Sequence, residues 1–216
     1  MKISRLERAK NFVRAHPLHA TLLAWYIVFW IFMAISPVDR SDWMLENLLA
    51  VIFIGVLIAT YRSSPLSDVS YVLITIFMTL HAVGAHYTYS EVPLGYWLKE
   101  AFHLTRNHFD RIVHFAFGLL MSYPFWEVLV RYARVRAAWA YVMAVTITLA
   151  FSGMFEVIES WVAQIVSPEL GDAYLGTQGD IWDAQKDMTL AFVGAVLCMI
   201  VVAAFQKVTP RRGQSA

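Results

Sequence analysis

The sequence predicts an all-α polytopic membrane protein, with six transmembrane helices in one bundle and a short interfacial helix between the third and the fourth. Two observations predict it. First, 59% of the 216 residues are hydrophobic and only 15% are charged, whereas about half of a soluble globular chain is apolar and about a quarter is charged. Second, the apolar residues gather in six runs, each close to the ~20 residues that cross a bilayer core. No stretch long enough for a soluble domain remains, so we expect residues 1–216 to form a single transmembrane domain.

The six runs follow one another along the chain, between two basic ends. Residues 1–18 are basic and precede the first run, as in a signal peptide, but the apolar stretch is long and Pro37 stands where cleavage would be expected. We therefore interpret the first run as a retained helix. A second basic segment, residues 206–216, follows the last run. The runs cover residues 19–36, 44–61, 70–89, 109–130, 137–161 and 181–205.

The connection between the third and fourth runs has a helical pattern of its own. Pro93 stands at its start, where a helix tolerates proline. Apolar residues then recur at helical spacing, from Leu94 and Trp97 to Phe102. This predicts a short amphipathic helix, which lies either in the outer membrane interface or over the mouth of the bundle as a lid. Either position would cover what lies beneath.

The basic residues predict the orientation. If the N-terminus is cytoplasmic, twelve of the 17 Lys and Arg residues fall on the cytoplasmic side, as the positive-inside rule requires. Both termini are then cytoplasmic. The net charge of +1 gives no information about nucleic acid, and no basic stripe outside the loops indicates nucleic-acid binding. The single cysteine, Cys198, excludes an intramolecular disulfide and a cysteine-based zinc site.

Four groups of ionisable residues lie inside or at the ends of the third, fourth, fifth and sixth runs. In this orientation all of them gather at the outer side of the membrane. Charges inside a membrane are costly, so such residues are functional candidates by default. The groups are His81 with His86, Asp110 with His114, Glu156 with Glu159, and Asp180 with Asp183 and Asp187.

Several of these residues also have a purely structural explanation. Asp180 could cap the last helix, with Asp183 at its third position, and Asp110 could belong to a cap begun by Asn107. A lone histidine in a membrane often makes only a hydrogen bond between helices. Asp187 differs, because it lies about two turns into its helix, where capping has ended.

The pair Glu156 and Glu159 needs a cation. Both lie near the C-terminal end of their helix, where the helix dipole disfavours anions. The cation could be a metal, a protonated histidine, Arg111 or Lys186. Nitrogen and oxygen donors without a thiolate suit zinc, manganese or iron, and carboxylate and histidine pairs on facing helices build such sites in bundles.

The resulting hypothesis assigns each candidate a role. The metal ligands are His86, Asp110, His114, Glu156 and Asp187. Glu159 and Asp183 remain as catalytic candidates for a general base. His81 lies deeper and would support the site or belong to a path, Asp180 stands at the rim, and Arg106, Arg111 and Lys186 could hold an anionic head group.

Four sequence blocks resemble the YjdF-like family of bacterial inner-membrane proteins. They are HAVGAHYTY (81–89), NHFDRIVHFAFG (107–118), FEVIESW (155–161) and YLGTQGDIWDAQKDM (174–188). The resemblance implies a multi-pass protein of the bacterial inner membrane with six helices. It implies no activity, because the family is a domain of unknown function.

Three functions remain open from the sequence. The first is a metal-dependent membrane hydrolase that acts on a lipid or lipid-linked substrate in the outer leaflet. The second is a small proton- or cation-coupled transporter, although the chain shows no internal repeat and its polar cluster lies off the midplane, unlike most transporter sites. The third is a non-catalytic membrane subunit in which the polar residues only hold the helices together.

Overall fold

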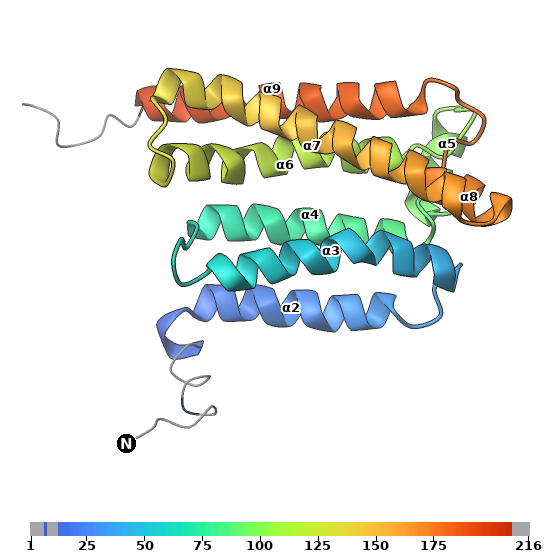
Figure 1. The fold of residues 1–216 in the computed structure, drawn as a ribbon, viewed down its shortest axis with the longest axis horizontal. Coiled ribbons are helices and arrows are strands. Elements are labelled where there is room, and N and C mark those ends of the chain that lie inside the picture. The colour runs from blue at the N-terminus through green and yellow to red at the C-terminus, as the bar shows by residue number, and fades with distance from the viewer. Residues whose placement is uncertain (1–6, 8–12, 209–216) are drawn as a thin grey trace, which may run out of the picture.

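The computed structural model describes residue 7 and residues 13–208, and helices joined by short turns make up almost all of that part (Figure 1). No strand occurs in these described ranges. Two helices are short, α5 (Pro93–Ala101) and α8 (Pro168–Leu175). The long helices are α2 (Pro17–Met33), α3 (Arg40–Thr60), α4 (Asp68–His86), α6 (Phe109–Arg131), α7 (Ala137–Ile165) and α9 (Asp183–Val208).

The predicted fold class is confirmed in its coarser form. Five helices, α3, α4, α6, α7 and α9, are long and apolar enough to cross a membrane. The helix α2 is apolar but has only 17 residues, about 25 Å at ~1.5 Å per residue, so a sixth span stays a prediction. The basic segments predicted at the two ends fall mainly on residues 1–6, 8–12 and 209–216, which lie outside the described residues.

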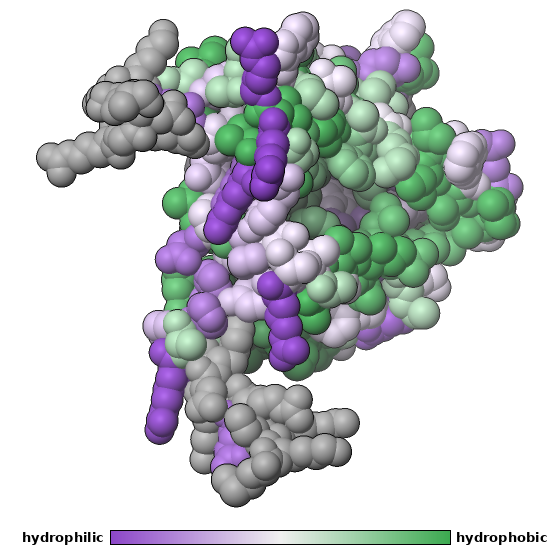
Figure 2. Space-filling model, turned by 60° about the vertical axis from the view of Figure 1, so that its left-hand side comes forward, coloured by the Kyte–Doolittle hydropathy of each residue, from purple (hydrophilic) through white to green (hydrophobic). Residues whose placement is uncertain are grey.

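Consecutive long helices alternate in direction (Figure 1). The start of α2 and the end of α9 therefore lie at the same end of the bundle, which we call the terminal end. The opposite end carries the two short helices, and we call it the α5/α8 end. In Figure 2, which turns the terminal end toward the viewer, hydrophilic side chains project from that end and hydrophobic residues cover the sides behind it. This distribution suits a bundle with lipid around its sides.

The helices α6 and α9 cross at very short range. Gly118 on α6 lies against the backbone of Ala191 and Ala195, and Gly194 on α9 lies against the backbone of Phe115 and Leu119. A side chain at either glycine would collide with the other helix. Small residues allow this close approach in membrane helices, and the crossing brings the N-terminal parts of α6 and α9 together at the α5/α8 end.

The predicted short helix between α4 and α6 is present as α5. Its apolar residues Leu94, Trp97 and Phe102 are exposed rather than packed against the bundle, while Gly95 is buried against Asn107. Its position at the membrane surface stays a prediction.

The sequence analysis did not predict α8. Local signals explain this helix: the hydroxyl of Ser167 accepts the backbone N–H of Leu170, Pro168 occupies the first turn, and Gly176 ends the helix with a φ of 58°, a left-handed conformation that glycine adopts at low cost.

Candidate metal centre

Three side chains from α6 and α9 converge on one point at the α5/α8 end. Asp110 and His114 lie one turn apart on α6, and Asp187 lies on the adjacent turn of α9. One ligand atom from each of the three residues lies within 4.8 Å of the other two. His114 and Asp187 are buried, and Asp110 is nearly so. This is the one group of three or more such residues found within the described ranges.

A fourth side chain reaches the same point from α7. The Nε2 atom of His114 lies 3.4 Å from Oε1 of Glu156 and 3.5 Å from Oδ1 of Asp110. Its other nitrogen, Nδ1, lies 3.4 Å from the hydroxyl of Ser152, so α7 also orients the ring. A metal-binding histidine commonly has such a partner on its second nitrogen.

Two oxygen atoms of this cluster have no hydrogen-bond partner in the described part of the chain. They are Oδ1 of Asp187 and Oε1 of Glu156, and both are fully buried. A buried carboxylate oxygen without a partner costs free energy. A divalent cation among Asp110, His114, Asp187 and Glu156 would satisfy both atoms, and the nitrogen and oxygen donors fit zinc, manganese or iron.

Glu159 lies one turn beyond Glu156 on α7 and is also buried. The carboxylates of Glu156, Asp110 and Asp187 are all close enough to act on it electrostatically. The two predicted glutamates therefore do face the α6–α9 cluster, with Glu156 in contact with His114 and Glu159 behind it.

Asp183 is engaged in ion pairs. Arg106 holds it with two hydrogen bonds, from Nη1 to Oδ1 at 2.5 Å and from Nη2 to Oδ2 at 3.1 Å. Nη2 of Arg111 donates to Oδ1 of Asp183 at 3.0 Å and to Oδ2 of Asp180 at 2.5 Å. Such charge-assisted pairs are strong. In this structure the Asp183 carboxylate anchors two arginines and is less available as a base.

Asp180 belongs to the same ion-pair network. Its carboxylate accepts a hydrogen bond from Nζ of Lys186 at 2.6 Å and from the backbone N–H of Trp182 at 3.1 Å. These bonds, with that from Arg111, hold the pKa of Asp180 well below its usual range. The contact to Trp182 lies in the turn before α9, which begins at Asp183.

The loop between α8 and α9 docks onto the residues before α6. Arg106 donates to the carbonyl oxygens of Gly176 and Thr177. Gln178 accepts the backbone N–H of Asn107 and donates to its carbonyl oxygen. The block YLGTQGDIWDAQKDM thus positions Asp187 through its loop as well as through its helix.

The two histidines of α4 point in different directions. Nδ1 of His86 lies 2.8 Å from the carbonyl oxygen of Met33, so His86 joins α4 to the end of α2 and is not part of the Asp110–His114–Asp187 group. Nδ1 of His81 lies 2.6 Å from the hydroxyl of Tyr89, and its Nε2 has no partner among the residues described.

Comparison with known proteins shows the family to which the chain belongs. A family model described as "Predicted membrane protein (DUF2238)" matches residues 18–208. The chain belongs to this family. It is also similar to the inner membrane protein YjdF of Escherichia coli (strain K12), with 38% identity over 177 residues, or 81% of this chain and 84% of that protein. No solved structure matches it. The resemblance seen in the sequence blocks is confirmed, and the homologue is an inner membrane protein.

Sequence reasoning missed two acidic residues of this DUF2238 chain. Asp42 and Glu46, on α3, are 1% and 3% exposed. Both oxygens of Asp42 and Oε2 of Glu46 have no partner in the described ranges. A signal was present: the two acids stand at i and i+4, which places them on one helix face. Asp42 lies just before the predicted second run, and Glu46 is a single acid within it.

Proposed function

We propose that this protein is a membrane-embedded, metal-dependent hydrolase whose centre is a divalent ion bound by Asp110, His114 and Asp187. One observation carries the proposal: ligand atoms of three residues from two helices lie within 4.8 Å of one another, while the buried Oδ1 of Asp187 lacks a partner in the part of the chain that is described. Zinc, manganese and iron fit this donor set.

The neighbouring residues have roles that follow from their positions. Glu156, whose Oε1 approaches Nε2 of His114, supplies a fourth ligand or accepts a proton from a water molecule. Glu159, one turn further along α7, is placed to pass that proton on. Ser152 holds the His114 ring through Nδ1. The metal, when bound, would acidify a water molecule and polarise the bond to be cleaved.

The substrate is proposed to be a lipid or a lipid-linked molecule. The α5/α8 end faces the outside of the cell in this proposal, because twelve of the 17 basic residues then lie on the cytoplasmic side. The exposed Leu94, Trp97 and Phe102 of α5 suit a helix that rests in the lipid interface. The buried Nε of Arg111 has no partner within the described ranges, so it can donate to an anionic head group.

Metal content tests the proposal first. We would measure zinc, manganese and iron in the detergent-purified protein after growth with each metal, for wild type, Asp187→Asn and His114→Ala. The matched control is Asp172→Asn, an exposed aspartate on α8 at the same end. We expect a near-stoichiometric metal in wild type and in the control, and at least a tenfold loss in the two site variants. A wild type that stays metal-free after supplementation would overturn the metal centre. The transporter and the non-catalytic membrane subunit would then be the remaining candidate functions.

Lipid hydrolysis then tests the reaction class. Protein in vesicles of defined phospholipid and lipid-linked composition would be assayed for release of head group or acyl chain, with and without a chelator. We expect release that a chelator stops, and that Glu156→Gln reduces at least a hundredfold, in line with ~10²–10⁴-fold for a general base. A metal-loaded protein without activity across the panel would retain the metal centre and refute the hydrolase.

A further inference from the structure

A second group of buried polar side chains lies between α3 and α4, next to the candidate metal centre. It consists of Asp42 and Glu46 on α3 and His81 on α4, with Tyr89 beyond the end of α4. Asp42, Glu46 and His81 are all at least nine-tenths buried. None of them belongs to the group of Asp110, His114 and Asp187, so this group is a separate feature of the fold.

Four polar atoms of these side chains lack a hydrogen-bond partner among the described residues. Both oxygens of Asp42, Oε2 of Glu46 and Nε2 of His81 are buried without a hydrogen bond inside the described ranges. The ring of His81 lies close to the backbone of Glu46. The hydroxyl of Tyr89 pairs with Nδ1 of His81, and the tautomer of the ring sets which of its nitrogens carries the proton.

The charged groups around Glu46 are acidic. The groups that act on it electrostatically are Asp42 and Asp110, both acidic. Arg106 and Arg111 are bound to Asp180 and Asp183, and the guanidinium of Arg40 lies over the ring of Trp43. A single divalent ion at Asp110 and Asp187 would offset those two carboxylates and leave Asp42 and Glu46 without a counter-charge, and buried charges are normally paired or bound to metals.

We propose that Asp42 and Glu46, with His81 beside them, hold a second cation next to the first, so that Asp110 lies between two metal positions. Two carboxylates one helical turn apart, completed by water, suit a hard divalent ion such as manganese or magnesium. The inference rests on the proposed function, because the second cation serves the same centre. Paired metals are typical of enzymes that cleave phosphate esters, so it narrows the proposed substrate to a phosphoester of a lipid.

Manganese binding measures the two positions separately. The full-length protein in detergent, stripped of metal, would be titrated with Mn²⁺ while free Mn²⁺ is counted by electron paramagnetic resonance. We expect about two bound ions in wild type, and about one in Asp42→Asn, Glu46→Gln and Asp187→Asn. The controls Glu100→Gln and Asp172→Asn change exposed acids at the same end and should keep two.

The outcomes distinguish this inference from the proposed function. One ion in wild type, lost in Asp187→Asn but kept in Glu46→Gln, would refute the second cation and leave the first centre intact. No ion in wild type would refute both. Loss of both ions in Glu46→Gln and in Asp42→Asn would mean that the two positions do not bind independently, and it would also refute a separate second cation. If Glu46→Gln fails to fold, Asp42→Asn and His81→Gln make the same test from two other positions.

Discussion

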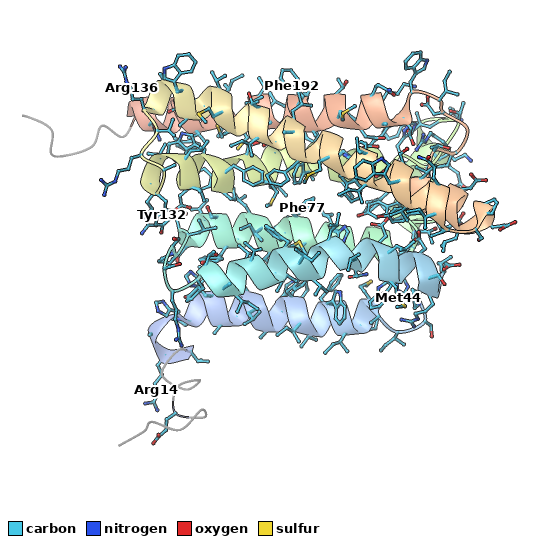
Figure 3. All side chains as sticks on the ribbon, in the orientation of Figure 1. Arg14, Met44, Phe77, Tyr132, Arg136 and Phe192 are labelled. Atoms are coloured by element: carbon cyan, nitrogen blue, oxygen red, sulfur yellow. The ribbon has the colours of Figure 1, made fainter. Side chains whose placement is uncertain are left out.

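Two groups of carboxylates at the α5/α8 end differ in how their charge is balanced. Asp180 and Asp183 are bound by Arg106, Arg111 and Lys186. Among the described residues, no arginine or lysine forms an ion pair with Asp110, Glu156 or Asp187, and the imidazole of His114 lies beside them. Figure 3 shows side chains crowded at this end of the bundle. The comparison teaches that residue type alone does not mark a site: the acids that already have partners hold the fold together, and those without partners are available to a ligand.

We call Asp180 and Asp183 the paired group, and Asp110, Glu156 and Asp187 the unpaired group. The largest expected effect comes from removing an arginine that binds the paired group. Arg106→Met removes the two hydrogen bonds that Arg106 donates to the buried carboxylate of Asp183 and leaves only the one from Arg111. Breaking one side of a buried ion pair costs about 3–5 kcal/mol. We expect a large fall in the thermal midpoint measured in detergent, and a partial return in the double variant Arg106→Met with Asp183→Leu. Lys99→Met on α5 is the control. An unchanged midpoint for Arg106→Met would show that the two groups do not differ as described.

The close crossing of α6 and α9 is the next strongest test, because it brings the unpaired group together. Gly118→Ala places a methyl group against the backbone of Ala191, and overpacking typically costs about 1–3 kcal/mol. We expect a lower thermal midpoint and weaker metal binding in the same variant. Gly55→Ala on α3 is the matched control, because a Cβ there meets nothing within 4 Å. Equal thermal midpoints and equal metal binding in the two variants would show that the close crossing of α6 and α9 affects neither.

A smaller effect, a gain in stability, is expected when a carboxylate of the unpaired group is neutralised in the metal-free protein. Asp187→Asn replaces a buried carboxylate whose Oδ1 lacks a partner in the described chain. A buried charge without a partner costs free energy, and a neutral amide removes that cost. The metal-free variant should therefore melt at or above wild type, whereas Asp183→Asn should melt below it. Thermal unfolding in a chelator measures both. If metal-free Asp187→Asn also melted well below wild type, the carboxylates of both groups would stabilise the fold, and the two groups would not differ as described.

The smallest effect belongs to the rim of the paired group. Lys186 is half exposed, and exposed ion pairs contribute little. Since the folded-state pKa of Asp180 is lowered, mainly by Lys186, the stability from this carboxylate is fully present above its unfolded pKa and is lost only as pH falls through the folded value. Lys186→Ala should therefore match wild type in thermal midpoint from pH 6 to pH 8. A difference that grows between those pH values would contradict this account.

The fold was predictable from sequence to the extent that it depends on local patterns. Apolar runs, Pro93 and helical spacing predicted the long helices and α5 within a few residues. The helix α8 was missed because its signals, Ser167, Pro168 and Gly176, act over only eight residues. The convergence of His114, Glu156 and Asp187 at one end followed from alternating helix directions, which short connections impose.

The partners of each acid were not predictable in the same way. Arg106 and Asp183 are separated by 77 positions, and only the docking of the α8–α9 loop onto Asn107 joins them. His86 was predicted as a ligand, and the structure joins it to Met33. Asp42 and Glu46 were overlooked, and packing buries both.

The sequence by itself determined that the chain is a helical membrane protein and that four groups of acids and histidines in its helices lie at one end. Those properties follow from hydrophobicity and helix periodicity, which are local. Only the tertiary structure decided which carboxylates meet an arginine and which meet one another. That choice depends on the depth at which α6 and α9 cross at Gly118 and Gly194, and contacts between distant segments have no signature in the spacing of residues along one helix.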